Sequence, residues 1–309
     1  MRELKLKVGE LIIEFRAADG FAGFKYPQDH QPFITSEGSP RCVVNVHYGR
    51  IPNIKLGTPV FQSGGLWSLH KRDAKYIVPL VSPVWGPSPY RLATFDESFR
   101  TGDLYISSAP SADGTLIQGT FDGGGFVLDP LAYPLDEVLV VNLLALEGGI
   151  NIHACGVDLG GRGLAFCGTS GTGKSTTARI WKKRNVRILS DDRLILRKRE
   201  GGFWVYGTPW HGEAALSYAG GVPLERIYFL AQAPANAARP LSRADAASRL
   251  LVHSFPTFYD SEGMEVTLRT IGEVCRTVPI YELGFVPNET VLDYLDGLHR
   301  LPSTAAARA

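Results

Sequence analysis

The spacing of apolar positions divides the chain into two parts. Before about residue 130, short segments alternate between apolar and polar residues or are rich in β-branched residues, a pattern typical of half-buried strands. Expected strands are 4–8, 11–15, 42–46, 66–70, 76–81, 90–95 and 104–107. We therefore expect a β-rich N-terminal domain over residues 1–130.

The pattern changes near Pro130, where strand and helix signals begin to alternate. Apolar residues cover most of the surface of a helix predicted at 135–146, so we expect this helix to be nearly buried. Asp136 and Glu137 occupy its first turn, where negative charge is favourable. Helices are also expected at 174–184, 244–252 and 289–298, with strands at 163–167, 186–189, 226–230 and 265–270 and a β-rich stretch at 194–206. The prediction is an α/β domain over residues 131–309.

Composition excludes several classes of protein. Lys plus Arg is 32 and Asp plus Glu is 31, a formal charge of +1, which argues against a nucleic-acid-binding protein with a broad basic surface. The four cysteines form no CxxC pair, so neither a zinc site nor a disulfide framework is expected. No signal-peptide core and no run of about 18 apolar residues occurs, so we expect a cytoplasmic protein without a membrane partner.

One segment carries recognisable chemistry. It fits the phosphate-binding P-loop pattern at every position, between an expected strand and an expected helix. Its residues are Gly168, Thr169, Ser170, Gly171, Thr172, Gly173, Lys174 and Ser175. Glycines let backbone N–H groups wrap a phosphate, and the helix N-terminus favours negative charge. Lys174 should reach the β- and γ-phosphates of ATP and the Ser175 hydroxyl should bind Mg²⁺.

A second feature is Asp191-Asp192, directly after the expected strand 186–189. The strand–helix–strand crossover should place this strand parallel to and near the strand before the P-loop, with both ending at one edge of the sheet. Two carboxylates there can divide labour, one holding Mg²⁺ and one accepting a proton from an attacking hydroxyl. The alternative is a solvated turn before Arg193.

His153 is a third candidate, in the apolar strand 150–157. A lone histidine on such a strand is more often structural. Because it precedes the P-loop strand by about one hairpin, it can instead lie beside the aspartate pair.

Together these elements resemble the catalytic domain of the HPr kinase/phosphorylase family, which shares its nucleotide site with ATP-dependent phosphoenolpyruvate carboxykinase. The match covers residues 153–157, the P-loop 168–175 and residues 189–192. In that family the histidine and the first aspartate activate the acceptor serine, and the second aspartate assists with Mg²⁺. The resemblance implies these roles for His153, Asp191 and Asp192, and a kinase domain of this type.

The chain departs from the family at Thr176, where an acidic residue usually follows the P-loop serine; we keep Thr176 in the expected nucleotide site. The phosphorylase signature is replaced by the segment 207–213, and the first 130 residues differ from the family's regulatory domain. The chain is more similar in outline to HPr kinase-like enzymes that phosphorylate peptides, such as lasso-peptide tailoring kinases.

Three further residues are candidates. Glu213 and His211 are expected near the metal or the acceptor, and Glu213 joins Ser175 and Asp192 as a candidate metal ligand. The alternative for both is a loop-capping role. Arg269 is expected to clamp the γ-phosphate, with a surface strand position as the alternative.

The sequence thus predicts an ATP- and Mg²⁺-dependent kinase acting on a serine of a peptide or protein. Competing hypotheses are a small-metabolite kinase on the same scaffold and a regulator that binds ATP without transferring phosphate. The aspartate pair favours transfer, because binding alone needs no base beside the metal. A homo-oligomer is compatible with the sequence.

Overall fold

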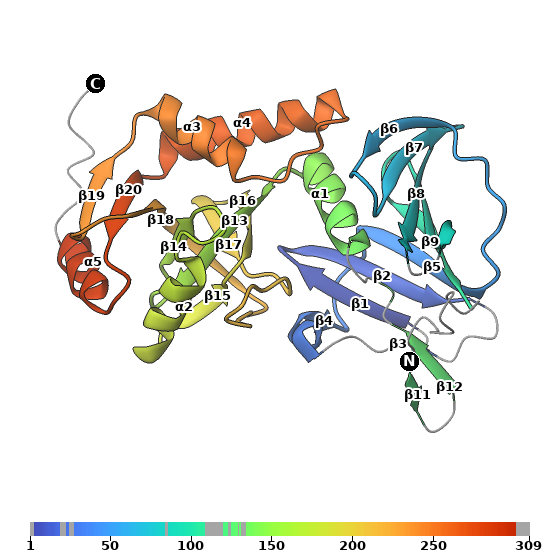
Figure 1. The fold of residues 1–309 in the computed structure, drawn as a ribbon, viewed down its shortest axis with the longest axis horizontal. Helices are drawn as coiled ribbons and strands as arrows, with labels where there is room; N and C mark the ends of the chain where they lie inside the picture. Colours follow the sequence, from blue (N-terminus) through green and yellow to red (C-terminus); the bar gives the residue numbers. More distant parts are fainter. Residues whose placement is uncertain are drawn as a thin grey trace. The chain divides into compact units, whose positions relative to one another are not determined.

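The structure is a computed structural model that describes residues 3–18, 23–24, 28–83, 86–108, 120–122, 125–128, 130 and 134–300. The chain divides into two compact units, Met1–Leu143 and Leu144–Ala309 (Figure 1). The helix α1 (Leu135–Glu147) contains this boundary and is buried over most of its length. The change of sequence pattern near residue 130 therefore precedes the boundary between the units by about one helix.

Unit 1 is built on a nine-stranded sheet that is mostly antiparallel, with β5 parallel to both of its neighbours. Its strands in spatial order are β4 (Ile34–Thr35), β1 (Glu3–Val8), β2 (Leu11–Ala17), β5 (Cys42–Gly49), β10 (Thr101–Ser107), β9 (Gly86–Asp96), β8 (Lys75–Ser82), β7 (Ser68–Arg72) and β6 (Thr58–Gln62). A short 3-10 helix, η1 (Gln28–Phe33), and a three-stranded sheet of β11 (Thr120–Asp122), β12 (Gly125–Leu128) and β3 (Gly23–Phe24) complete it.

The strands of unit 1 follow the alternation in the sequence. In β1, Leu4, Leu6 and Val8 are buried while the lysines between them point outward. This period of two is that of a strand with one face on a core. Each of the seven strands expected in this part overlaps an observed strand.

Unit 2 is a mixed α/β unit. Its strands are β13 (Ile150–Asp158), β14 (Gly163–Cys167), β15 (Arg187–Ser190), β16 (Arg193–Arg199), β17 (Gly202–Tyr206), β18 (Gly221–Gln232), β19 (Ala237–Pro240) and β20 (Ile280–Phe285). Its helices are α2 (Lys174–Lys183), α3 (Arg243–Val252), α4 (Ser261–Thr277) and α5 (Thr290–Arg300). The sheet order is β14-β13-β16-β17-β18-β20-β19, with β15 on β13 and an added β14–β18 pairing.

The long strand β13 positions the site, because its two halves have different neighbours. Its first half pairs with β16, and its second half lies between β14 and β15, antiparallel to both. Both β14 and β15 therefore run in the same direction on either side of β13. The segments that follow them, beginning at Gly168 and Asp191, emerge at the same edge, beside His153 and Ala154.

Helices cover both faces of this sheet (Figure 1). Alternate residues of β13, such as Ile152 and Val157, belong to different cores. The first core includes α3 and α4, and the second includes α2 and α5. Unit 2 thus holds the site segments on a sheet packed from both sides.

The expected strand at 265–270 is wrong, because these residues lie in the middle of α4. The buried residues Gly263, Thr267, Ile271 and Val274 recur with helical spacing and face the core. Asp260 caps the helix by accepting hydrogen bonds from the amides of residues 262 and 263. This packing overrides the strand preference of the β-branched residues around position 266. In the described part of the chain, no helix combines the length and apolar character needed to span a membrane.

Candidate functional site

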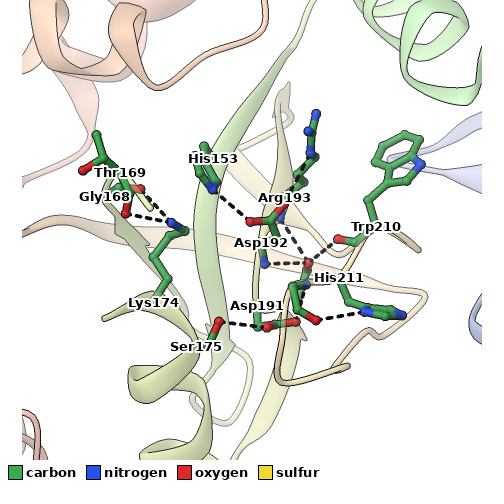
Figure 2. Close-up of polar contacts among 12 residues, drawn as sticks. His153, Gly168, Thr169, Lys174, Ser175, Asp191, Asp192, Arg193, Trp210 and His211 are labelled. Atoms are coloured by element: carbon green, nitrogen blue, oxygen red, sulfur yellow. Dashed lines mark hydrogen bonds and ion pairs between the residues drawn. The ribbon is translucent and has the colours of Figure 1, made fainter. Parts of the chain in front are cut away.

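The glycine loop, residues 168–175, joins β14 to α2 and closes on the side chain of Lys174 (Figure 2). The Lys174 ammonium donates to the carbonyls of Gly168 at 2.8 Å and Thr169 at 3.1 Å. Gly173 has a φ of 108°, and a Cβ there would lie 2.5 Å from the Phe285 ring. Only glycine fits this close left-handed position at the start of α2.

Lys174 is 6% exposed, and this burial lowers its pKa below the ordinary value. The negative charges of Asp192 and Asp191 act in the opposite direction. The amine is therefore largely buried, and it donates to neutral carbonyls of its own loop. An anion bound in the loop would stabilise its charged form.

Asp191 is fully buried and holds two parts of the site together (Figure 2). Its Oδ2 accepts hydrogen bonds from the Ser175 hydroxyl at 3.2 Å and the Ala214 amide at 2.9 Å. Its Oδ1 accepts from the amides of Gly212 at 2.9 Å and Leu216 at 3.3 Å. Both carboxylate oxygens are thus engaged, and the 211–216 segment is attached to the start of α2 through this side chain.

The neighbouring Asp192 has a different environment. Its Oδ1 lies 2.9 Å from Nε2 of His153, and its Oδ2 lies 3.4 Å from Nε of Arg193 (Figure 2). Burial opposes ionisation of Asp192, but the hydrogen bond and charge of His153, with the charges of Arg193 and Lys174, keep its pKa below the ordinary value. The side chain remains 27% exposed. Asp192 is therefore an ionised carboxylate that reaches solvent.

A pocket of about 210 Å³ lies between these groups. Nine of the expected site residues line it: His153, Ser170, Gly171, Gly173, Lys174, Ser175, Thr176, Asp192 and Glu213. The pocket thus brings together the glycine loop, the histidine and the second aspartate.

The other expected residues do not line this pocket. Gly168 and Thr169 contribute carbonyls to Lys174, and the Thr172 hydroxyl donates to the Thr169 carbonyl at 2.7 Å. Asp191 lies behind Ser175, and the His211 Nδ1 lies 3.1 Å from the Gly212 carbonyl oxygen. These residues surround the pocket without facing it.

Arg269 also lies outside the pocket lining. It is an exposed residue of α4, where a strand was expected. The alternative, a surface strand position, is wrong because Arg269 lies in a helix. Its expected role at the γ-phosphate stays a prediction, and Arg269 is not among the residues that line the pocket.

Sequence reasoning missed Arg179, which lines the pocket from α2. Its Nη2 lies 3.9 Å from a carboxylate oxygen of Glu213, and both side chains are exposed. Arg179 follows Ser175 by four residues, so the two share a face of the helix. That spacing was the signal available in the sequence.

No cluster of three or more His, Cys, Asp and Glu suited to a metal occurs among the residues that the structure describes. Mg²⁺ bound with a nucleotide usually takes one or two protein oxygens and completes its shell with phosphates and water. The Ser175 hydroxyl, with the Asp191 carboxylate behind it and Asp192 in the pocket, provides oxygen donors of this kind. The residues present therefore fit Mg²⁺ accompanied by ATP.

Comparison with protein families matches residues 135–286 to the family described as SynChlorMet cassette protein ScmC. A comparison with curated proteins gives no match. Among solved structures, the HPr(Ser) kinase/phosphatase from Coxiella burnetii is similar over 48% of this chain and 90% of its own, with 13% identity and a TM-score of 0.29. A TM-score of this size does not establish a shared fold.

Proposed function

We propose that unit 2 is a kinase that uses ATP and Mg²⁺ to phosphorylate a hydroxyl, and that the acceptor is a serine of a peptide or protein. One observation carries this proposal: a single pocket is lined both by Lys174 and Ser175 of the glycine loop and by the hydrogen-bonded His153–Asp192 pair. Phosphate binding and proton removal are the two tasks that such a transfer requires.

The glycine loop would hold the ATP phosphates through its backbone N–H groups. The Lys174 ammonium would replace its hydrogen bonds to two loop carbonyls with hydrogen bonds to phosphate oxygens. Its positive charge stabilises negative phosphate oxygens more strongly in a buried site than in water. The Ser175 hydroxyl would hold Mg²⁺, and its hydrogen bond to Asp191 would orient it. Bound Mg²⁺ supplies charge neutralisation at the β- and γ-phosphates.

Asp192 is the better candidate for the proton acceptor, which reverses the two aspartate roles implied by the family resemblance. Asp191 accepts four hydrogen bonds and does not line the pocket, so using it as a base would break the attachment of the 211–216 segment. Asp192 lines the pocket, is ionised, and has His153 to stabilise and orient it.

The proposed step balances without another reactant. The acceptor oxygen forms a bond to the γ-phosphorus while the bond from that phosphorus to the β–γ bridging oxygen breaks, and ADP leaves. The hydroxyl proton passes to Asp192 and then to solvent. Lys174 and Arg179 would stabilise the negative charge on the transferred group.

A peptide or protein acceptor is supported by the resemblance to peptide-phosphorylating kinases and by an exposed edge strand in unit 1. Its nine-stranded sheet ends at β6, whose residues are largely exposed. An extended chain can add to such an edge through main-chain hydrogen bonds.

The experiment that tests this function compares acceptors. The full chain is incubated with γ-labelled ATP and Mg²⁺, together with serine-containing peptides, free serine or sugars. Label in phosphoserine of a peptide supports the proposal. Label only in small molecules would favour the metabolite kinase, and ATP binding without any labelled acceptor would favour the regulator.

A further inference from the structure

The loop between α3 and α4 lies along the first half of β13. The His153 amide donates to the His253 carbonyl at 2.7 Å, and the Phe255 amide donates to the Asn151 carbonyl at 3.0 Å. Ile152 and Ser254 form an antiparallel bridge between these two bonds. The loop is thus fixed by main-chain hydrogen bonds to the strand that carries His153.

This attachment places the ring of Phe255 against both partners of Asp192. The Arg193 guanidinium carbon lies 4.1 Å from the centroid of the Phe255 ring. The ring centroids of His153 and Phe255 are 6.3 Å apart, with an interplanar angle of 53°. One aromatic side chain, from a segment about 60 residues after Arg193 and about 100 after His153, therefore contacts the two groups that bind the Asp192 oxygens.

A carboxylate with a partner on each oxygen keeps one orientation only while both partners stay in place. Arginine has a long flexible side chain, and a ring beneath its guanidinium restricts that freedom. His153 lines the pocket and is similarly limited by the ring beside it. Phe255 can thus limit both partners at once.

We propose that Phe255 is a positioning residue that fixes the Asp192 carboxylate through Arg193 and His153. The inference rests on the proposed function, because that function makes Asp192 the group that accepts the proton of the acceptor hydroxyl. Phe255 does not line the pocket, whereas the nucleotide-binding residues Lys174 and Ser175 do and come from another loop. Loss of the ring should therefore lower kcat and leave the KM for ATP unchanged.

The experiment uses the full chain with Phe255→Leu, which keeps apolar bulk, and Phe255→Tyr, which keeps the ring face. We expect Phe255→Leu to lower kcat by about tenfold to a hundredfold, the size of effect that misplacing a catalytic group produces. Phe255→Tyr should restore most of the lost kcat. If Phe255 had only a structural role, Phe255→Leu would lower thermal stability but would not lower kcat while leaving the KM for ATP unchanged.

A matched pair controls for loss of an arginine–aromatic contact. Arg199 lies at the other end of β16, with its guanidinium carbon 5.9 Å from the centroid of Tyr206. Arg193→Lys should lower kcat as Phe255→Leu does, whereas Arg199→Lys should not. Equal effects of the two lysine substitutions, an unchanged kcat in Phe255→Leu, or no rescue by tyrosine would overturn the proposal.

A second readout does not depend on the reaction. The side-chain N–H signal of Arg193, assigned through its loss in Arg193→Lys, should be shifted by the ring current of Phe255 and should move in Phe255→Leu. If the wild type shows this shift but transfers no phosphate, the proposed function is contradicted and the positioning role is not. Absence of the shift would contradict the positioning role, whatever the activity.

Discussion

At the scale of single residues, two adjacent aspartates have different roles because their surroundings differ. Asp191 is surrounded by amide donors and the Ser175 hydroxyl, while Asp192 faces the pocket between His153 and Arg193. Sequence alone finds the pair but cannot divide its roles, because the amides that occupy Asp191 come from residues 21 to 25 positions further along. Their approach depends on how the 211–216 segment folds back.

The two aspartates should respond differently to the same substitution. Asp191→Asn places an amide among N–H donors in a fully buried site, so we expect the free energy of unfolding to fall by about 3 kcal/mol. Asp192→Asn should lower stability less than Asp191→Asn does and keep ATP affinity, but it should lower transfer by about 10²- to 10⁴-fold, because it removes the proton acceptor. Thermal unfolding, ATP binding and kcat measured on both variants check this. Loss of kcat in a stable Asp191→Asn, with normal kcat in Asp192→Asn, would restore the opposite assignment.

Glu213 offers a second comparison at this scale. Its side chain is 87% exposed and its pair with Arg179 is long, so Glu213→Gln should change stability by less than about 1 kcal/mol. If the Ser175 hydroxyl holds Mg²⁺, Ser175→Ala should raise the Mg²⁺ concentration needed for transfer far more than Glu213→Gln does. A Mg²⁺ titration of the two variants measures this, and an equal or larger effect of Glu213→Gln would make Glu213 a metal ligand.

At the scale of elements, periodicity predicted most strands and helices of both units. The failure at α4 has a physical reason: its β-branched residues favour a strand locally, while a buried face of helical spacing and the Asp260 cap decide the outcome. The strands β19 and β20 were not predicted. Their partners are each other and β18, about 50 residues earlier, so their pairing is not visible in local sequence.

The turn between β9 and β10 depends on one carboxylate. Asp96 accepts hydrogen bonds from the amides of Ser98, Arg100 and Thr101 and from the hydroxyls of Ser98 and Thr101. Burial alone would raise its pKa, but these bonds lower it from 3.8 to about 2. A carboxyl with a lower pKa in the folded state stabilises the protein above its unfolded pKa and loses this effect as the pH falls.

We therefore expect Asp96→Asn to destabilise unit 1 by about 1–2 kcal/mol near neutral pH, after allowance for the partial exposure of Asp96. The difference from wild type should shrink as the pH falls from about 4 to about 2. Denaturant unfolding at a series of pH values measures it. Asp73→Asn, in the β7–β8 turn with its side chain 82% exposed, is the matched control and should show no such dependence. A constant difference across this pH range would contradict the role given to Asp96.

At the scale of the whole molecule, the two units divide the proposed work. Every residue of the site belongs to unit 2, and its geometry depends on β13 being shared between two sets of strands. The sequence predicted that β14 and β15 would run parallel with their ends at one edge. The β13–β14 hairpin is local, and it was the reason to consider His153 beside the aspartate pair. The pairing of β13 with β15, which places β13 between the two parallel strands, is not visible in local sequence.

If unit 1 holds an extended acceptor, a chain of residues 131–309 should lose peptide phosphorylation while slow ATP hydrolysis or ATP binding remains. Circular dichroism should first show that the shorter chain retains its helices. The measurement is transfer to a serine peptide, compared with ATP hydrolysis in the same sample. Undiminished peptide phosphorylation would give unit 1 a role other than acceptor binding.

The central claim is that the glycine loop directs the γ-phosphate of ATP to an acceptor serine. Its most direct test is transfer of label from γ-labelled ATP to a serine peptide by Lys174→Ala, with Lys183→Ala as the control on the same helix. Lys183 is exposed at the far end of α2 and contacts Glu289, so its loss should change nothing. The account predicts that Lys174→Ala transfers at least about 10³-fold more slowly than wild type, because charge stabilisation at the phosphates is lost. Equal transfer by the two variants would contradict it.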